Sequence, residues 1–449
     1  MIQAIFRKHF VGVLVALTTV TVPRAQADGG VLIGALRWDN WTAQSSELKV
    51  VEQPEWKNRV PFFAQRGEDS KLTIAGDLEN VLSAEVAYAY SAGIDYFVFG
   101  FYPETSAWGR NTSESVSLNR ALETYLQLPD RRGVRFAISL NQSFPQQDVD
   151  DISKSIASFV SNKDYVRTST GVAPIFVFSK GWSGVYGSDE AAKQVVQRIK
   201  DNVYKQSGVQ LLFILEYPDP ATAAEQARNS GMDMTTAYAT FAPAQPGAHE
   251  FKDCVANSSA YWQRSTKANF PFIPNVTLGW DPRPRDTIRL SEGKDAQVKT
   301  WCGAAHKEDV SVLVRSAMQL AATGGASAPF RSVLVYAWNE FTEGGWLAPT
   351  WTDGLANLEA FRAATGRKRT LAQVDLTWPE MSMGNQCPVR TGDRQRNEVV
   401  RSCKISATGA PPWPCPPGTV ASSERVRAPT GLEALYWSGL WTEQSCRGG

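Results

Sequence analysis

The sequence predicts a (β/α)8 barrel, or TIM barrel, followed by a small Cys/Pro-rich C-terminal appendage. Eight short apolar runs alternate with segments of helical periodicity, and such β and α units build parallel sheets that close at eight strands. Polar and aromatic residues follow the apolar runs, where a barrel opens into its site. An open doubly wound sheet is the alternative, but no GxGxxG or GxxxxGKS/T motif follows a run, so the phosphate-binding turns of nucleotide folds are missing.

The expected strands are short and apolar, as strands covered on both faces are. They span residues 31–36, 94–101, 134–140, 174–178, 210–215, 233–238, 272–278 and 333–336. Apolar residues at helical spacing predict helices over 78–91, 118–128, 150–160, 189–205, 221–229, 258–268 and 308–322. The chain of 449 residues has room for one large domain and a small one.

The N-terminus has the features of a signal peptide over residues 1–27. Arg7 and Lys8 precede an apolar segment at 10–22, and Ala25-Gln26-Ala27 has the small-x-small pattern of a cleavage site. The apolar segment is too short to span a bilayer, and no later stretch approaches 18 apolar residues. We therefore expect a secreted or periplasmic protein with no membrane span, whose barrel domain occupies residues 28–365.

The cysteines agree with export. An even number in an exported chain suggests disulfides, and the six are Cys254, Cys302, Cys387, Cys403, Cys415 and Cys446. The simplest connectivity pairs Cys254 with Cys302, although the sequence does not prove it. Residues 366–449 are rich in Pro, Gly, Arg and Cys, which predicts a disulfide-stapled, loop-rich region. With no CxxC pair and three His, we expect no metal site and no cofactor.

Composition favours an uncharged ligand. A net charge of +1 gives no reason to expect nucleic acid as a partner. The 15 Trp, 13 Tyr and 20 Phe favour a flat ligand such as a polysaccharide or oligosaccharide, because sugar C–H faces pack well on aromatic rings. Nothing in the sequence predicts an oligomeric state.

The candidate catalytic residues are Glu340 and Glu343. They directly follow the eighth expected strand, among Trp338, Phe341 and Trp346. One acid to protonate a departing oxygen and a second group to assist at the sugar are what glycosidic cleavage needs. Two neighbouring acids also repel each other's charge, so one keeps its proton to higher pH. In the alternative, the aromatics are core and the glutamates are solvated loop charges.

The ends of the expected strands supply candidate substrate-binding residues. These are Trp38, Asp39, Tyr102, Asn141, Glu216, Tyr238, Trp280, Asp281, Arg283, Asn339 and Trp346. Three have structural alternatives: Glu216 as a partner of Arg283, Asp281 as the cap of a turn, and Asn339 as a loop clip. Ser179 follows the fourth expected strand, but no His is near it to form a hydrolytic triad.

The segment WNEFTEGGWLAPT, residues 338–350, resembles the strand-eight motif of glycoside hydrolase family 99, the endo-α-mannosidases, and of WbsX-like domains found with polysaccharide biosynthesis. The segments AGIDYFVFGFY (92–102), PIFVF (174–178) and IPNVTLGWDPRPR (273–285) are similar to the same group, so the resemblance covers about residues 31–360. It implies a glycoside hydrolase of the barrel fold.

The resemblance also implies roles for the two glutamates. Glu340 would draw the proton from the 2-hydroxyl of the substrate, whose oxygen displaces the aglycone, and Glu343 would protonate the leaving oxygen and later activate water. This is a retaining route without a protein nucleophile. Phe341-Thr342 stands where the family has Trp-His, so mannose is not implied as the sugar. The alternatives are a catalytically silent glycan-binding or polysaccharide-assembly protein and a non-carbohydrate enzyme.

Overall fold

The computed structural model describes residues 30–369 and four later strands. Within the first part, residues 43–44, 46, 67–71, 105–117, 141–143, 179–181, 304, 306, 324–328, 351, 354 and 368 lie outside the described residues. The later strands fall at 389–393, 398–404, 419–427 and 441–448, without side chains. The expected signal peptide and the candidate Asn141 therefore lie outside the described residues.

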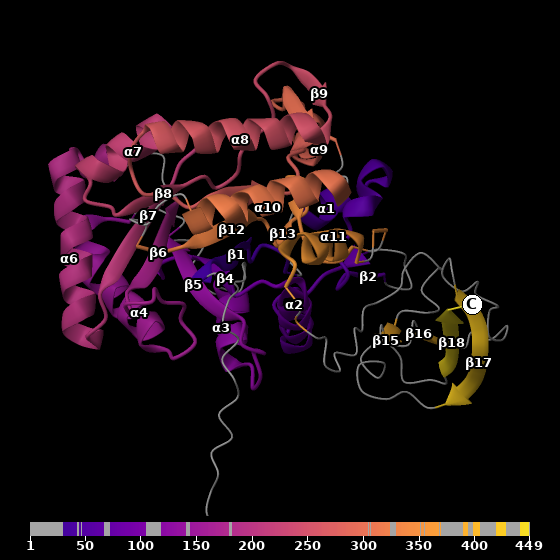
Figure 1. Ribbon diagram of the computed structural model, residues 1–449. Helices are drawn as coiled ribbons and strands as arrows, with labels where there is room; N and C mark the ends of the chain where they lie inside the picture. Colours follow the sequence, from indigo (N-terminus) through magenta and orange to yellow (C-terminus); the bar gives the residue numbers. More distant parts are fainter. Residues whose placement is uncertain are drawn as a thin grey trace, which may run out of the picture.

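Eight parallel strands form the central sheet and confirm the predicted fold class (Figure 1). In spatial order they are β10 (Asn275–Thr277), β12 (Ser332–Tyr336), β1 (Leu32–Arg37), β4 (Tyr96–Phe101), β5 (Arg135–Leu140), β6 (Ala173–Phe178), β7 (Leu211–Glu216) and β8 (Met234–Thr236). A parallel bridge between Thr235 of β8 and Phe272, just before β10, closes the ring. Each expected strand corresponds to one of these eight, because an uninterrupted apolar run is the signature of a strand buried on both faces.

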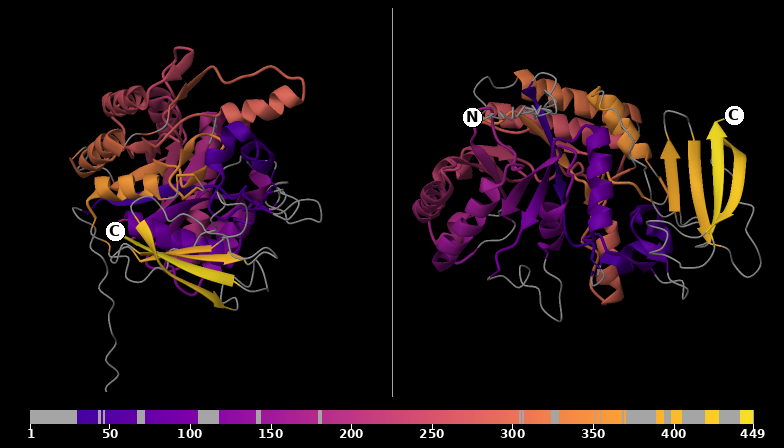
Figure 2. Two further views of the ribbon diagram at one scale, coloured as in Figure 1. Left: turned by 90° about the vertical axis from the view of Figure 1, so that its right-hand side faces the viewer. Right: turned by 90° about the horizontal axis from the view of Figure 1, so that it is seen from below.

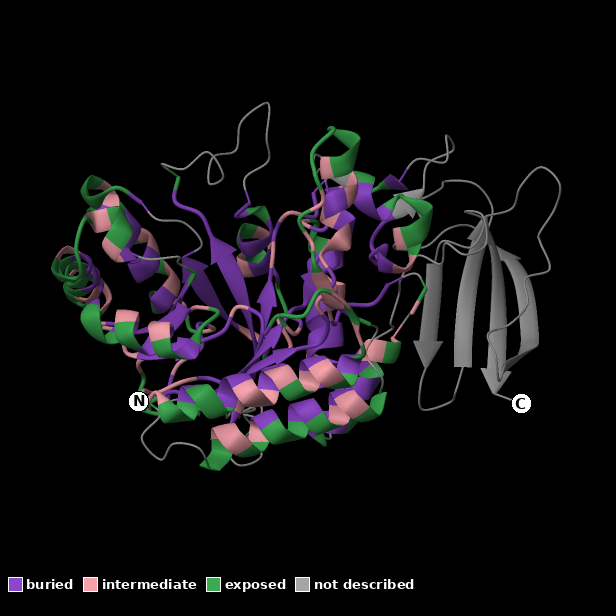
Figure 3. Cartoon of the chain, turned by 90° about the horizontal axis from the view of Figure 1, so that it is seen from above, coloured by how far each residue is buried: buried purple, intermediate pink, exposed green. Residues whose placement is uncertain are grey.

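Helices surround the sheet, and Figure 3 shows buried strands inside helices whose outer faces are exposed. They are α2 (Glu79–Ala92), α3 (Arg120–Gln127), α4 (Val149–Ser161), α6 (Asp189–Ser207), α7 (Pro220–Asn229), α8 (Phe251–Lys267), α10 (Lys307–Thr323) and α11 (Ala356–Thr365). The seven predicted helices are confirmed, and α11 is an addition. Helix α8 begins seven residues before its expected start, at a capping box formed by Glu250 and Asp253. Among the helices of the described residues, none combines the length and apolarity needed to cross a bilayer.

Several short elements lie in the loops between strands. Helices α1 (Glu47–Val51) and η2 (Pro54–Arg59) and strands β2 (Gln65–Arg66) and β3 (Leu72–Thr73) follow β1. Beyond β5 and β6 come η3 (Gln146–Asp148) and α5 (Trp182–Tyr186), and around β10 lie β9 (Gly247–His249), α9 (Arg283–Ser291) and β11 (Thr300–Cys302). The predicted disulfide between Cys254 and Cys302 is confirmed, and it joins α8 to β11.

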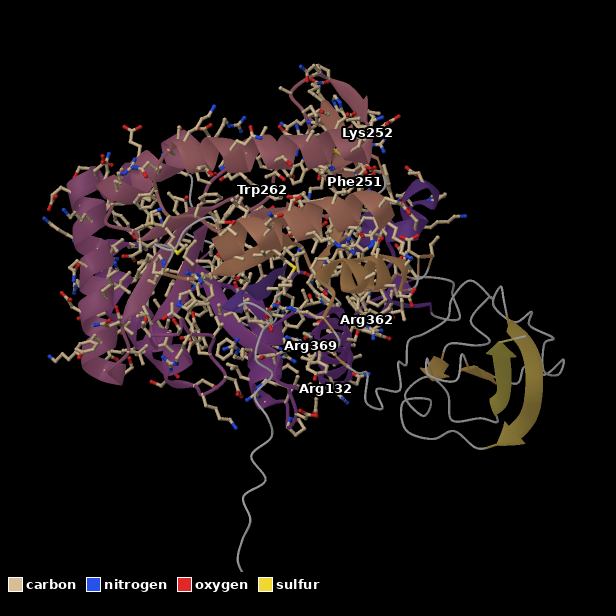
Figure 4. The ribbon with its side chains drawn as sticks, viewed as in Figure 1. Arg132, Phe251, Lys252, Trp262, Arg362 and Arg369 are labelled. Atoms are coloured by element: carbon tan, nitrogen blue, oxygen red, sulfur yellow. A yellow bond between two sulfur atoms is a disulfide. The ribbon has the colours of Figure 1, made fainter. Side chains whose placement is uncertain are left out.

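Contacts between helix and sheet fix α8 against the barrel. Trp262 of α8, labelled in Figure 4, is 5% exposed, and its Nε1 donates a hydrogen bond of 3.1 Å to the carbonyl of Asn275 in β10. A buried tryptophan needs a partner for its N–H, and here the end of a strand provides it. Helix α8 is thereby attached to the strand that leads into α9.

Two arginines after α11 close the N-terminal end of the barrel. Arg367 donates to the carbonyls of Gly93 and Val31 and to the carboxylate of Asp95, each at 2.6 Å. Arg369, labelled in Figure 4, also pairs with Asp95. Asp95 in turn accepts a 2.8 Å hydrogen bond from the amide of Ile33. The contacts of the barrel therefore continue past residue 365 to Arg369.

The C-terminal region contains a second sheet (Figure 2). Strands β15 (Val389–Asp393), β16 (Glu398–Lys404), β17 (Thr419–Arg427) and β18 (Trp441–Gly448) are antiparallel in the order β15-β16-β18-β17. The sequence predicts loops here, because polar residues occupy successive positions of β17, TVASSERVR, and leave little apolar alternation. The disulfide stapling of this region stays a prediction.

Candidate active site

The strand-eight acids lie on a tight hairpin at the C-terminal end of β12. Strands β13 (Asn339–Glu340) and β14 (Gly345–Trp346) pair antiparallel, with Glu340 opposite Gly345, and Glu343 lies in the turn between them. Gly344 has a φ of 86°, and a Cβ on Gly345 would lie 2.3 Å from the Tyr336 ring. The two glycines are needed because the hairpin packs so closely on its surroundings.

The two acids share one cation, and each accepts a hydrogen bond from a tyrosine of its own. The Tyr238 hydroxyl donates a hydrogen bond of 2.6 Å to Glu340 Oε1. Arg285 Nη1 and the Tyr336 hydroxyl donate to the two oxygens of Glu343. Arg285 Nη2 lies 3.9 Å from Glu340 Oε2. The arginine therefore bridges the pair but contacts Glu343 more closely.

Burial raises the pKa of both carboxyl groups. Glu340 is 2% exposed, and its pKa lies well above the usual range because of burial first and the negative charge of Glu343 second. Burial also raises the pKa of Glu343, against the opposing effects of Arg285 and Tyr336. Glu47 of α1 is a third acid here, held by the Thr342 hydroxyl, and its charge raises both pKa values further. The expectation that one acid keeps its proton has a physical basis in this arrangement.

Arg285 reaches the acids because α9 is held at its first turn. Asp281 accepts hydrogen bonds of 2.8 and 2.9 Å from Arg283 and also pairs with Arg59. The Arg283 guanidinium lies 4.2 Å from the ring centroid of Trp301, and Arg59 lies 4.7 Å from that of Trp56. These contacts fix the helix start two residues before Arg285.

Asn339 and Asp39, both candidate substrate-binding residues, are used by the protein itself. Asn339 is fully buried, accepts from the Trp38 amide at 2.8 Å and donates to the Trp38 carbonyl at 2.6 Å. Asp39 is buried, pairs with Arg37 and accepts from the amide of Leu122 at 3.2 Å. The contacts of Asn339 agree with the alternative role, in which its side chain fixes a loop. Asp39 belongs to a cluster of buried charged residues.

Glu216 and Arg283, which the sequence analysis offered as possible partners, bind different residues. Glu216 Oε1 accepts a hydrogen bond of 2.8 Å from Ser139, and Oε2 has no partner in the described part of the chain. Arg283 is bound to Asp281. Glu216 therefore remains a buried acid at the end of β7. Asp281 binds Arg59 and Arg283, and it also accepts a hydrogen bond from the Arg283 amide in the turn before α9.

Aromatic rings gather around the acids. Tyr336 lies with its ring centroid 5.0 Å from Tyr238 and 5.9 Å from Trp280. These rings continue outward to Phe178, 4.8 Å from Tyr238, and to Phe241, 4.5 Å from Trp280, both more than a third exposed. Two rows of aromatic rings therefore lead from the site to the surface, one through Tyr238 to Phe178 and the other through Trp280 to Phe241.

The remaining candidate aromatics divide between site and core. Trp38 donates to the Tyr102 hydroxyl at 3.0 Å, and its ring lies 5.6 Å from the Arg285 guanidinium. Trp346 is half-buried beside Phe341. Trp338, in contrast, is fully buried against Phe97 and belongs to the core.

Sequence reasoning missed Arg285, Tyr336 and Glu47. Arg285 is one of two arginines in the run DPRPR, where spacing does not show which of them reaches the acids. Tyr336 ends an apolar strand and is indistinguishable there from a core residue. Glu47 lies almost 300 positions before the acids it approaches. Within the described residues, no group of three or more His, Cys, Asp or Glu side chains is placed to hold a metal ion.

Solved structures similar to this chain include glycoside hydrolases of several families, and an orotidine 5'-monophosphate decarboxylase is also among them. A GH99 endo-α-mannosidase from Bacteroides thetaiotaomicron in complex with BIS-TRIS-Propane has 14% identity and a TM-score of 0.47, over 76% of this chain and 96% of that one. A GH113 β-1,4-mannanase has 8% identity and a TM-score of 0.39, over 76% and 99%. A family 39 enzyme from Bacteroides cellulosilyticus WH2 has 9% identity and a TM-score of 0.36, over 87% and 82%.

No family model and no curated protein matches the chain. The GH99 endo-α-mannosidase comes from the family that the strand-eight motif resembles. At these identities and TM-scores, the chemistry of the site has to be derived from its own residues.

Proposed function

We propose that the protein is an exported glycoside hydrolase that cleaves glycosidic bonds in a polysaccharide or glycoconjugate, with Glu340 and Glu343 as its catalytic pair. The observation that carries the proposal is the pair itself. Two buried carboxyl groups lie on one hairpin, share the guanidinium of Arg285 and have raised pKa values. They stand where barrel enzymes carry their sites, at the C-terminal end of a strand.

The surroundings of the pair support sugar chemistry. The proton that one acid retains is available to a departing glycosidic oxygen, and the other acid stays ionised beside Arg285. The rows of aromatic rings through Tyr238 and Trp280 offer flat apolar faces to sugar rings. A retaining outcome follows the resemblance of the strand-eight motif, and the sugar remains to be identified by assay.

The test is turnover by the purified protein. α-Linked manno-, gluco- and furanosidic polymers are incubated with it, and products are identified by NMR, which also reports the anomeric outcome. Glu340→Gln and Glu343→Gln should each lower turnover by about 10²- to 10⁴-fold, as loss of acid or base catalysis does, and leave polymer binding nearly unchanged. Glu225→Gln, at an exposed position, is the matched control.

Two outcomes would overturn the proposal. Variants that release reducing ends as fast as the wild type would remove these residues from catalysis. Binding of a polymer without turnover of any substrate would favour a silent glycan-binding or polysaccharide-assembly protein.

Export has its own test. Expression of the full chain in a secreting host, followed by N-terminal sequencing, should give a mature protein that starts at Asp28. A product that retains Met1 inside the cell would contradict the proposed signal peptide.

A further inference from the structure

We propose that Glu47 is a positioning residue of the proposed active site: it fixes the turn between Glu340 and Glu343 and, as a third negative charge, sets the pH range in which the pair works. The inference rests on the proposed function and concerns the regulation of the same site by pH. Glu47 acts through the two acids and does not itself have to meet the substrate. Its place in the fold, its hydrogen bond and its charge point to this role.

Glu47 reaches the hairpin from a distant part of the chain. It is the first residue of α1, in the long connection after β1, and it is 9% exposed. Its Oε2 accepts a hydrogen bond from the hydroxyl of Thr342, which is fully buried in the turn directly before Glu343. The Thr342 side chain is therefore directed to α1, and the place of Glu343 in the turn depends on this bond.

The same connection holds the hairpin at two further points. Trp41 Nε1 donates a hydrogen bond of 2.8 Å to the carbonyl of Asn339. Arg59 Nη1 donates one of 3.2 Å to the carbonyl of Phe341. Both of these bonds end on the backbone of the hairpin and do not involve Glu47. The hairpin therefore stays anchored when Glu47 alone is changed, and a variant without its charge should still fold.

Charge gives Glu47 its second effect. Three carboxyl groups, those of Glu47, Glu340 and Glu343, stand around one guanidinium, that of Arg285. Burial is the main cause of the raised pKa values of Glu340 and Glu343, and the negative charge of Glu47 raises both pKa values further. The effect of Glu47 on the pair is thus opposite to that of Arg285.

The other groups that face the acids either lower their pKa values or are paired with one another. They are the hydroxyls of Tyr238 and Tyr336, the guanidinium of Arg285, and the paired Arg59, Arg283 and Asp281. The two hydroxyls and Arg285 act against burial. In the part of the chain that the structure describes, Glu47 is therefore the group outside the hairpin whose charge favours the protonated forms of both acids.

The consequence for turnover follows from the sign of this interaction. A nearby anion stabilises the protonated form of an acid, so loss of the Glu47 charge should lower the pKa of Glu340 and that of Glu343. The two limbs of the kcat/KM pH profile report the acid and the base of the free enzyme. Both limbs should therefore move to lower pH when residue 47 is neutral, whichever of the two acids donates the proton.

The first test needs no substrate. Glu47→Gln removes the charge but keeps an oxygen that can accept from Thr342, and Glu55→Gln, at an exposed position of η2 in the same connection, is the matched control. Proteins labelled with carbon-13 at the glutamate carboxyl carbon are titrated by NMR, and the signals of Glu340 and Glu343 are assigned from their Gln variants. Both titration steps of the pair should move to lower pH in Glu47→Gln and stay unchanged in Glu55→Gln.

Turnover gives the second readout. Glu47→Gln should move both limbs of the kcat/KM profile to lower pH and lower kcat at the optimum by less than about 10-fold, against about 10²- to 10⁴-fold for loss of an acid or base. Glu47→Asp keeps the charge but is one methylene too short to hold Thr342. It should leave the limbs near their wild-type positions and lower kcat by about 10- to 100-fold, because the turn is misplaced. This variant tests the positioning role even if Glu47→Gln does not fold.

Unmoved titration steps in a folded Glu47→Gln protein would overturn the inference. A Glu47→Asp variant with the kcat of the wild type would overturn the positioning role in the same way. A wild-type protein that turns over no substrate would overturn the proposed function, while the NMR titration would still decide whether Glu47 acts on the pair. The two failures are thereby distinguishable.

Discussion

Glu216 shows how much a single buried acid affects the pH dependence of stability. Its one hydrogen bond among the described residues comes from Ser139, and burial raises its pKa to about 7. The folded protein therefore keeps a proton on Glu216 at pH values where the unfolded chain, with a pKa near 4.5, has lost it. Stability falls as pH rises from the unfolded to the folded pKa.

Glu216→Gln should be more stable than the wild type at pH 8, by on the order of 3 kcal/mol, because the amide carries no charge to bury. The difference should shrink toward zero below pH 4.5, where both side chains are neutral. Urea unfolding of both proteins at several pH values measures this, with the exposed Glu225→Gln as control. If the free energies of unfolding of the wild type and of Glu216→Gln changed in parallel with pH, the raised pKa of Glu216 in the folded protein would be contradicted.

A substitution of Asn339 distinguishes a residue that holds the loop in place from one that binds the ligand. Asn339→Ala removes both hydrogen bonds to the backbone of Trp38, and it should lower the free energy of unfolding by about 1–3 kcal/mol. Thermal melting measures the loss. A raised KM with an unchanged melting temperature would show instead that the side chain binds sugar.

The residues found from sequence and those missed differ in what positions them. Glu340 and Glu343 were predictable because their place after an apolar strand is a local property of the chain. Arg285 reaches them only through the pairing of its neighbour Arg283 with Asp281 and the stacking of that neighbour on Trp301. Such a chain of tertiary contacts leaves no periodic signal.

Among the elements, long apolar strands and amphipathic helices were predicted, and short loop elements were not. Strands β13 and β14 have two residues each, too few to show a period. Their hairpin depends on Gly345, which packs on Tyr336, and on Gly344, which packs on Asp281. Helix α9 starts in the sequence RPRD, whose proline and charges read as a turn. The elements that build the site are thus the least visible in sequence.

The disulfide between Cys254 and Cys302 closes the segment that contains α9. Cys254→Ser with Cys302→Ser should lower the free energy of unfolding by up to about 4 kcal/mol, since the bond closes a loop of 48 residues. Turnover should fall too, because Arg285 lies in that loop. Chemical unfolding and activity assays measure both effects.

Ala256→Ser, an exposed change on the same helix, is the control and should shift stability by less than about 0.5 kcal/mol. Equal stability of the double variant and the wild type would show that the surrounding contacts hold the segment alone.

At the scale of the whole molecule, Arg367 and Arg369 decide where the barrel can be cut. A chain shortened after residue 370 keeps both arginines on Asp95, whereas one shortened after residue 365 leaves this carboxylate buried without a cation. Breaking a buried pair by removing the partners costs about 3–5 kcal/mol. The shorter chain should therefore have a melting temperature well below that of the longer chain in calorimetry. Equal melting temperatures would contradict a stabilising role for the pairs of Arg367 and Arg369 with Asp95.

The overall architecture was predictable because the repeated alternation of strand and helix is a property of the whole chain. The strands of the C-terminal sheet were not, since polar residues interrupt their alternation. The barrel boundary near residue 365 followed a change in composition, which does not reveal that the next arginines reach back to Asp95.

The two hydrogen bonds between Asn339 and the backbone of Trp38 join residues that are 301 positions apart in the chain. Contacts of such long range form late, because the loop between them must first be closed against its entropy. During synthesis, β1 and Trp38 directly after it emerge long before the hairpin that carries Glu340. The acid pair is thus ordered only when the ends of the barrel meet, so a half-synthesised chain has no assembled site.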